Sequence, residues 1–124
     1  MLNEKNLTKL LGEQIVEYKT ISGWTILRLN NGLAVCLAQV TGLSFGAGTS
    51  WAGGYFHACT SGISLPAIFN ATPRVFYEKP DAVLSMIVGH QSLSKDTAVP
   101  YLFNGAADSL TGLKLDVLAI GTWK

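Results

Sequence analysis

The sequence predicts an all-β fold, an antiparallel β-sandwich preceded by a short N-terminal helix. Two observations support this fold class. After Gly12 the chain alternates runs of β-branched and aromatic residues with Gly, Asn and Pro, and no second helical pattern follows. Most connections between these runs are short enough to join antiparallel neighbours. The 124 residues fit one domain, large enough to bury about two thirds of the unfolded surface.

Residues 1–13 are predicted to form the helix, and residues 14–124 the sandwich. Asn3 can cap the helix, the leucines at positions 7, 10 and 11 fall on one face, and Gly12 ends it. A helix of about nine residues is too short to be stable alone, so its leucine face must pack on something. Three copies meeting on an axis would supply that partner, as the neck of a trimeric stalk. A helix folded onto its own domain is the alternative.

Seven or eight short strands are expected in the sandwich, at residues 15–19, 24–29, 33–39, 55–65, 74–78, 83–90, 99–103 and 113–123. Several are apolar on both faces. In the last strand Leu118 and Ile120 interrupt the polar side, so one face packs inside the sandwich and the other must meet a neighbour. Trp24 and Trp123 have apolar neighbours at period two, which predicts core or interface positions.

One connection, residues 41–54 with the sequence TGLSFGAGTSWAGG, differs from the rest. It is too long and too rich in glycine for a simple turn, and it contains Phe45 and Trp51. Long loops on a rigid β scaffold usually carry recognition. We therefore expect this segment to be a binding loop.

Charge is scarce and unevenly placed. The chain is 48% apolar and 14% charged with a net charge of +1, so it has no electrostatic footprint for nucleic acid or anionic lipid. Between residues 20 and 77 only Arg28 and Arg74 are ionised at neutral pH. Because subunit interfaces lose charge at their centres, part of this surface is expected to be covered by other copies of the same chain.

The sequence has no apolar run of the about 20 residues that a membrane helix needs, and its polar start lacks the layout of a signal peptide. Assembly in a reducing cytoplasm is therefore expected. Cys36 and Cys59 lie in separate apolar segments without metal-ligand spacing, which favours two buried free thiols over a disulfide.

Catalytic signatures are absent from the sequence, so no enzyme, cofactor or metal is expected. His57 and His90 have no nearby carboxylate or cysteine at ligand spacing, and no serine lies in a G-x-S-x-G context. Acidic residues capable of pairing across space as glycosidase carboxylates are Glu78, Asp81, Asp96, Asp108 and Asp116. That alternative stays open.

Three short motifs carry a resemblance to a known family. Trp24-Thr25 followed by Gly32, Ala34 and Cys36 resembles the W-T-x6-G-x-A-x-C pattern that opens small C-terminal domains of tailed-bacteriophage tail fibres and receptor-binding proteins. The ending LAIGTWK is similar to the close of the same domains, and FNATPRVF to a strand, T-P turn and strand between them. The likeness spans residues 14–124, although Leu37 stands where the family usually has an aromatic residue and residues 41–55 do not align.

Those domains are trimeric β-sandwiches related to the H-type lectins, and they bind host-surface saccharide or protein at the far end of a fibre. The resemblance implies a homotrimeric, non-catalytic receptor-binding tip, carried on the virion by the rest of the tail fibre or baseplate and acting at the host cell surface. A structural fibre cap or trimerisation module is the alternative within phage biology, and a glycan depolymerase is a third hypothesis.

Counting chain reversals places the expected site. If the strands run up and down in order, residues 30–32, 70–73 and 92–97 turn at the fibre end, and residues 20–23, 41–54, 78–82 and 104–112 turn at the distal end. Trp51 could stack on a sugar ring with Tyr55 as a second wall, or it could plug the end of the sandwich. The polar residues expected to bind ligand are Lys79, Asp81, Asn104 and Asp108.

Overall fold

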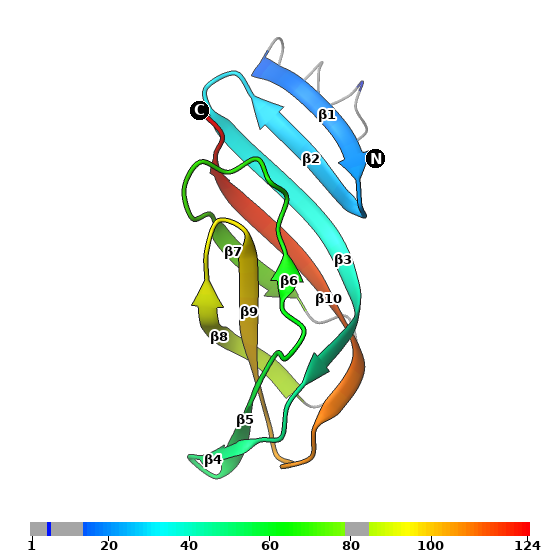
Figure 1. Ribbon diagram of the computed structural model, residues 1–124, viewed down its shortest axis with the longest axis vertical. Coiled ribbons are helices and arrows are strands. Elements are labelled where there is room, and N and C mark those ends of the chain that lie inside the picture. Colours follow the sequence, from blue (N-terminus) through cyan, green and yellow to red (C-terminus); the bar gives the residue numbers. More distant parts are fainter. Residues whose placement is uncertain (1–4, 6–13, 79–84) are drawn as a thin grey trace.

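The computed structural model describes residues 5, 14–78 and 85–124, and these form an all-β fold of two antiparallel sheets (Figure 1). The first sheet has the order β1-β2-β3-β10-β7, and the second has the order β4-β5-β9-β6 with β8 also paired to β9. The strands are β1 (Ile15–Ile21), β2 (Trp24–Leu29), β3 (Leu33–Phe45), β4 (Thr49–Trp51), β5 (Gly54–Ala58), β6 (Ile63–Ser64), β7 (Arg74–Glu78), β8 (Ser85–Leu93), β9 (Thr97–Asn104) and β10 (Leu110–Thr122). The predicted all-β class is confirmed. Apart from Lys5, the predicted N-terminal helix lies outside the described residues.

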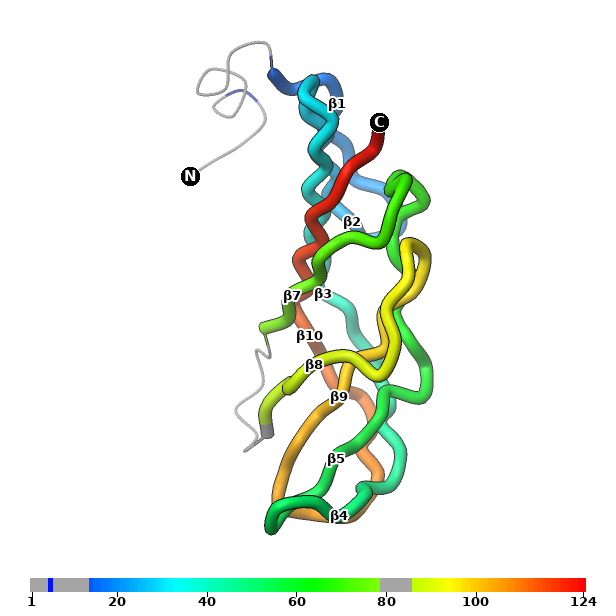
Figure 2. The backbone as a smooth tube through the Cα atoms, turned by 90° about the vertical axis from the view of Figure 1, so that its left-hand side faces the viewer, coloured from blue at the N-terminus to red at the C-terminus, as the bar shows by residue number. Residues whose placement is uncertain are grey.

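The two sheets share one hydrophobic core, and Figure 2 shows them as two layers along most of the length of the molecule. The first sheet contributes Ile26, Cys36, Val117 and Ala119, and the second contributes Ile63, Ala98 and Leu102, each at most 2% exposed. These residues alternate with exposed or half-buried ones along their strands, as one buried face per sheet requires.

Two long central strands set the length of the first sheet. β3 and β10 each have 13 residues and pair from Leu33 and Thr122 at one end to Phe45 and Leu110 at the other. β2 pairs with only a short stretch of β3, residues 34–37. The turn at residues 20–23 therefore lies beside the middle of β3. The prediction that this turn shares the distal end with residues 41–54 is wrong, because β1 and β2 are too short to reach it.

The lower end in Figure 1 holds the segment that was expected to be a loop, and most of that segment is strand. β3 continues through Phe45, and β4 then pairs with β5 in a hairpin from Thr49 to Phe56. Ala52 and Gly53 join the two strands with φ of 49° and 82°, the backbone that a tight two-residue hairpin needs. The expectation of a loop at residues 41–54 is thus corrected to the end of β3 followed by a tight hairpin.

The chain is tied together at the upper end by its C-terminal residues. The Trp123 N–H donates to the Gly32 carbonyl, and the Asn70 N–H donates to the Thr122 carbonyl. The Trp123 indole donates to the Leu29 carbonyl at 2.9 Å, and the Arg28 guanidinium lies 4.8 Å from its ring. Trp123 is half-buried against the core, so it lies where a core or interface residue was expected.

The other two residues predicted to be structural lie in the core. Trp24 is 7% exposed, and Cys36 is fully buried. Cys36 and Cys59 are both free thiols, as expected. The single strand predicted at residues 55–65 is instead two strands, β5 and β6, because Gly62 with a φ of 66° breaks the extended chain between them. Within the described residues there is no helix of the length and hydrophobicity that crossing a membrane requires.

Candidate functional site

The outer face of the second sheet carries a cluster of aromatic side chains. Phe56 of β5 lies opposite Phe103 of β9, and Tyr101 lies two pairs further along the same two strands, opposite Ala58. Since side chains alternate along a strand, these three rings share the face turned away from the core. Trp51, on β4, joins them from the neighbouring strand.

The four rings contact one another in tilted and edge-to-face geometries. The Phe56 ring lies at the centre, with its centroid 5.2 Å from Trp51, 5.8 Å from Tyr101 and 5.2 Å from Phe103. Trp51 also meets Phe103 edge-on at 6.5 Å. Aromatic pairs at these separations stabilise each other by about 0.5–1.5 kcal/mol beyond the area they bury. The cluster is therefore a preformed surface whose rings hold one another in place.

A glycine makes room for this cluster. A Cβ placed on Gly54 would lie 2.3 Å from Phe103 Cζ and 2.8 Å from the Asn104 carbonyl oxygen. The Phe103 ring therefore lies directly over the backbone at the start of β5. Any side chain at position 54 would push the ring or the neighbouring strand away.

Much of this surface is open to solvent. Trp51 is 61% exposed, Met86 on β8 is 59% exposed and Val88 is 43% exposed. Met86 lies opposite Phe103, so the apolar surface continues from β4 across β5 and β9 to β8. Trp51 does not plug the end of the sandwich, because a plug would be buried. Continuous exposed apolar surface of this kind marks an interaction site.

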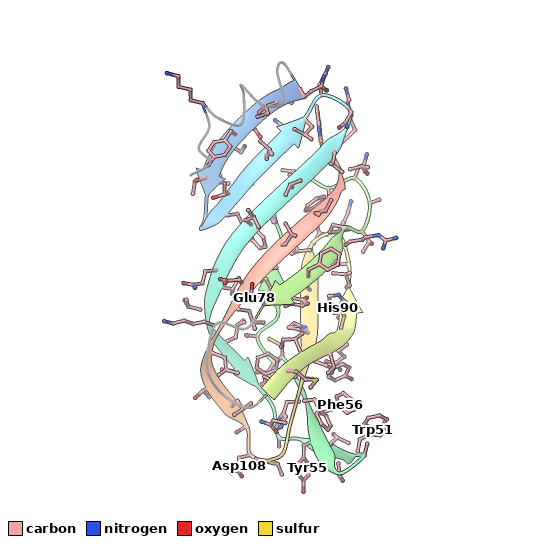
Figure 3. The ribbon with its side chains drawn as sticks, turned by 180° about the vertical axis from the view of Figure 1, so that it is seen from behind. Trp51, Tyr55, Phe56, Glu78, His90 and Asp108 are labelled. Atoms are coloured by element: carbon pink, nitrogen blue, oxygen red, sulfur yellow. The ribbon has the colours of Figure 1, made fainter. Side chains whose placement is uncertain are left out.

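Beside the aromatic rings runs a groove of about 570 Å³. In Figure 3, Trp51 and Phe56 project from the lower part of the molecule, with His90 further up on the same side. The groove is lined by Gly46, Ala47, Thr49, Ser50, Trp51, Phe56, Ala58, Thr60, Val88, Gly89, His90, Gln91 and Tyr101. We call this surface the aromatic groove. It offers an apolar wall with hydroxyl, amide and imidazole groups around it.

His90 is held in place from the core side. The Tyr77 hydroxyl lies 2.9 Å from His90 Nδ1, and the two rings are 5.3 Å apart. Burial, with a smaller contribution from Cys59, raises the pKa of the Tyr77 phenol above its usual range, so the phenol keeps its proton. When the phenol donates to Nδ1, the imidazole proton resides on Nε2. His90 then has one ring nitrogen free to donate a hydrogen bond.

A second histidine fixes the lower end of the scaffold. His57 is fully buried, its Nδ1 is 2.8 Å from the Gly46 carbonyl oxygen, and its Nε2 is 2.8 Å from Asn104 Oδ1 and 2.9 Å from the Ala106 carbonyl oxygen. The ring thereby ties the end of β3 to the connection between β9 and β10. The role of His57 is therefore structural.

The structure separates the residues that were predicted to bind ligand. Trp51 lies in the aromatic groove. Tyr55 is on the opposite side of β5, and Figure 3 shows it with Asp108 at the lower tip. Asn104 is only 9% exposed, and its Oδ1 also accepts a hydrogen bond from the Ala106 N–H, so it supports the scaffold instead of facing a ligand.

The other two predicted ligand residues, Lys79 and Asp81, lie outside the described residues. The structure adds residues that sequence reasoning did not assign to the site, namely Phe56, Tyr101, Phe103 and His90. The period-two spacing of Tyr101 and Phe103 on one strand was a usable signal. Their partnership with Phe56 depends on the β5–β9 register, which the sequence does not contain.

The outer face of the first sheet is a second, different surface. Leu37, Leu118 and Phe76 are direct neighbours across β3, β10 and β7, and Leu37 and Phe76 are 51% and 53% exposed. A groove of about 700 Å³ runs beside them. It is larger than the aromatic groove, but the exposed row of Leu37, Leu118 and Phe76 beside it contains only one aromatic ring. Such a broad face suits a protein subunit better than a small ligand.

Two of the acidic residues considered as glycosidase carboxylates lie together on that face. Glu78 on β7 is directly opposite Asp116 on β10, and Asp116 accepts a hydrogen bond from Gln39 Nε2 at 3.3 Å. Asp96 and Asp108 lie elsewhere, on different connections. Within the described ranges no group of three His, Cys, Asp or Glu side chains is arranged to hold a metal ion.

Comparison with known proteins places this chain in no family. Neither a known protein family, nor a curated protein, nor a solved structure matches it.

Proposed function

We propose that this chain is the receptor-binding tip of a bacteriophage tail fibre or receptor-binding protein, and that it binds host cell-surface saccharide without catalysis. The observation that carries the proposal is the aromatic groove, with Trp51 61% exposed beside the partly exposed Phe56 ring. Flat aromatic faces stack on the apolar faces of sugar rings, and nearby hydroxyl, amide and imidazole groups bond to sugar hydroxyls. The three sequence motifs add the resemblance to phage tip domains.

We further propose that the chain acts as a homotrimer on the virion. Support comes from the outer face of the first sheet, where Leu37, Leu118 and Phe76 form an apolar row without cover from any described residue. Burying such a row between subunits removes its apolar area from water. The two surfaces then have separate roles, with the first sheet facing other subunits and the second sheet facing the receptor.

Adsorption blocking tests the proposed function. The purified domain, added to host cells before phage, should reduce phage adsorption, and the Trp51→Ala variant should block much less well. Asn31→Ala is the matched control, because Asn31 lies in the β2–β3 turn at the opposite end of the molecule. Equal blocking by all three proteins would contradict a receptor site in the aromatic groove, and no blocking by the wild-type domain would favour the structural cap.

A glycan depolymerase is the second candidate, and the pairing of Glu78 with Asp116 is the observation that favours it. Directly opposed strand residues have Cβ atoms about 5 Å apart, within reach of the carboxylate separations that glycosidases use. Incubation of the domain with host glycan distinguishes the two functions. Release of new reducing ends, abolished in Glu78→Gln, would establish hydrolysis and would contradict the non-catalytic proposal.

A further inference from the structure

The aromatic groove has an unusual electrostatic character for a site built mainly from polar and aromatic residues. Among the described residues that line it, none is Asp, Glu, Lys or Arg. Its polar groups are the hydroxyls of Thr49, Ser50, Thr60 and Tyr101, the Gln91 amide and the His90 imidazole. The aromatic surface beside the groove extends over Phe103, Met86 and Val88, which are also uncharged.

An anionic sugar would fit this lining poorly. A uronate or a phosphorylated sugar carries a strongly hydrated charge, and moving it against aromatic rings removes water without supplying a counter-charge. Aromatic faces are themselves negative, which adds repulsion. Hydroxyls and amides are instead matched in kind to sugar hydroxyl and acetamido groups, which both donate and accept.

The geometry also provides two distinct kinds of contact along the groove. Trp51 and Phe56, with ring centroids 5.2 Å apart and planes at 50°, form a wall on which a pyranose ring can stack by its apolar face. His90, oriented by its bond to Tyr77, and Gln91 lie on β8 at the other side of the groove. A ring stacked on Trp51 and Phe56 would thus present its hydroxyl edge to the His90 and Gln91 side chains.

We infer that the aromatic groove takes an uncharged glycan, an oligosaccharide of neutral or N-acetylated pyranoses, in preference to an acidic one. This inference rests on the proposed saccharide-binding function and specifies its substrate class. The neutral lining carries the selectivity, and the Trp51–Phe56 wall carries most of the affinity.

Titration with matched oligosaccharides tests it. The probes are oligomers of galactose and glucose and, for each, the oligomer of the corresponding uronate. The neutral member should bind at least tenfold more tightly than its uronate, and its affinity should stay constant between about 0.05 and 0.5 M salt, because no ion pair forms. Equal or tighter binding of the uronates would overturn the inference while leaving saccharide binding intact.

A charge placed in the groove provides a second readout. Gln91→Lys should raise the affinity for oligogalacturonate about tenfold, because the ammonium supplies the missing counter-charge. Gln14→Lys is the matched control, since it makes the same change at an exposed residue before β1, next to the β2–β3 turn and away from the groove. Equal gains in both variants would show a nonspecific charge effect and would contradict the assigned groove. Failure of every neutral oligosaccharide to bind would overturn the inference, and adsorption blocking would then decide whether the receptor-binding function survives.

Discussion

Replacing Gly54 by alanine should destabilise the domain and disturb the aromatic groove together. The new Cβ would lie 2.3 Å from Phe103 Cζ and 2.8 Å from the Asn104 carbonyl oxygen. The Phe103 ring is half-buried and can swing outward, but the Asn104 carbonyl belongs to the β9 backbone paired with β5. The contact with backbone must therefore be relieved by separating the two strands or by tilting the hairpin.

Overpacking of this kind costs about 1–3 kcal/mol of unfolding free energy. For a chain of this size each kcal/mol lowers the melting temperature by about 4 °C, so the expected decrease is about 4–12 °C. The assay is thermal unfolding followed by far-UV circular dichroism, with the intrinsic tryptophan fluorescence, to which Trp51 contributes, as a second probe.

The matched control is Gly105→Ala. A Cβ on Gly105 meets no atom within 4 Å, and its backbone is not in the left-handed region, so alanine should leave the melting temperature unchanged or raise it slightly. If Gly54→Ala melted within about 1 °C of the control, the close approach of Phe103 to the β5 backbone, and with it the packing of the groove, would be wrong.

Three further predictions concern the core, the thiols and the assembly. Trp24→Ala should lower the unfolding free energy by about 3–5 kcal/mol because Trp24 is 7% exposed, whereas Trp51→Ala should lower it by less than about 2 kcal/mol. Chemical denaturation measures both losses, and equal losses would contradict the different burial of the two rings. Burial raises the pKa of the Cys36 thiol from 9.0 to about 11, so its contribution to stability is fully present below pH 9.0 and is lost as the pH rises toward about 11. Denaturation across that pH range should show a decrease that is smaller in Cys36→Ala, and an identical decrease in both proteins would refute this assignment. Light scattering should return about three times the chain mass of 13.3 kDa, and Phe76→Lys should yield folded monomer, because it places a charge in the apolar row that subunits would bury; a wild-type monomer at micromolar concentration would contradict the trimer.

The strand positions could be predicted from the sequence wherever alternation and turn residues agree. The bounds predicted for β2 and β7 are those observed, at residues 24–29 and 74–78. The loop predicted at residues 41–54 was wrong because its glycines are typical of loops, although Gly54 and Gly48 permit close packing here. A Cβ on Gly48 would lie 2.6 Å from Tyr55 Cβ, so this glycine permits β4 to approach β5. Sequence alone does not distinguish a glycine needed for packing from one needed for flexibility.

The candidate site was predicted only in part, and the reason is strand register. Trp51 was identified from its position among glycines, but its partners Phe56 and Phe103 are 5 and 52 positions away and meet it through two strand pairings. Asn104 was expected to face a ligand because the sequence placed it in the distal turn at residues 104–112. Its side chain points inward because β9 places every second residue, including Leu102, on the core face.

The most direct test of the central claim is to map ligand contacts by nuclear magnetic resonance on the isotopically labelled chain. The probe is the neutral oligosaccharide that binds most tightly in the matched panel. Addition of this ligand should change the chemical shifts of Trp51, Phe56, Tyr101 and the His90 imidazole. The chemical shifts of Tyr55 and Asp108 at the tip should stay unchanged. Perturbation confined to the tip or to the outer face of the first sheet, or none with any oligosaccharide, would contradict the proposal that the aromatic groove is the receptor-binding site.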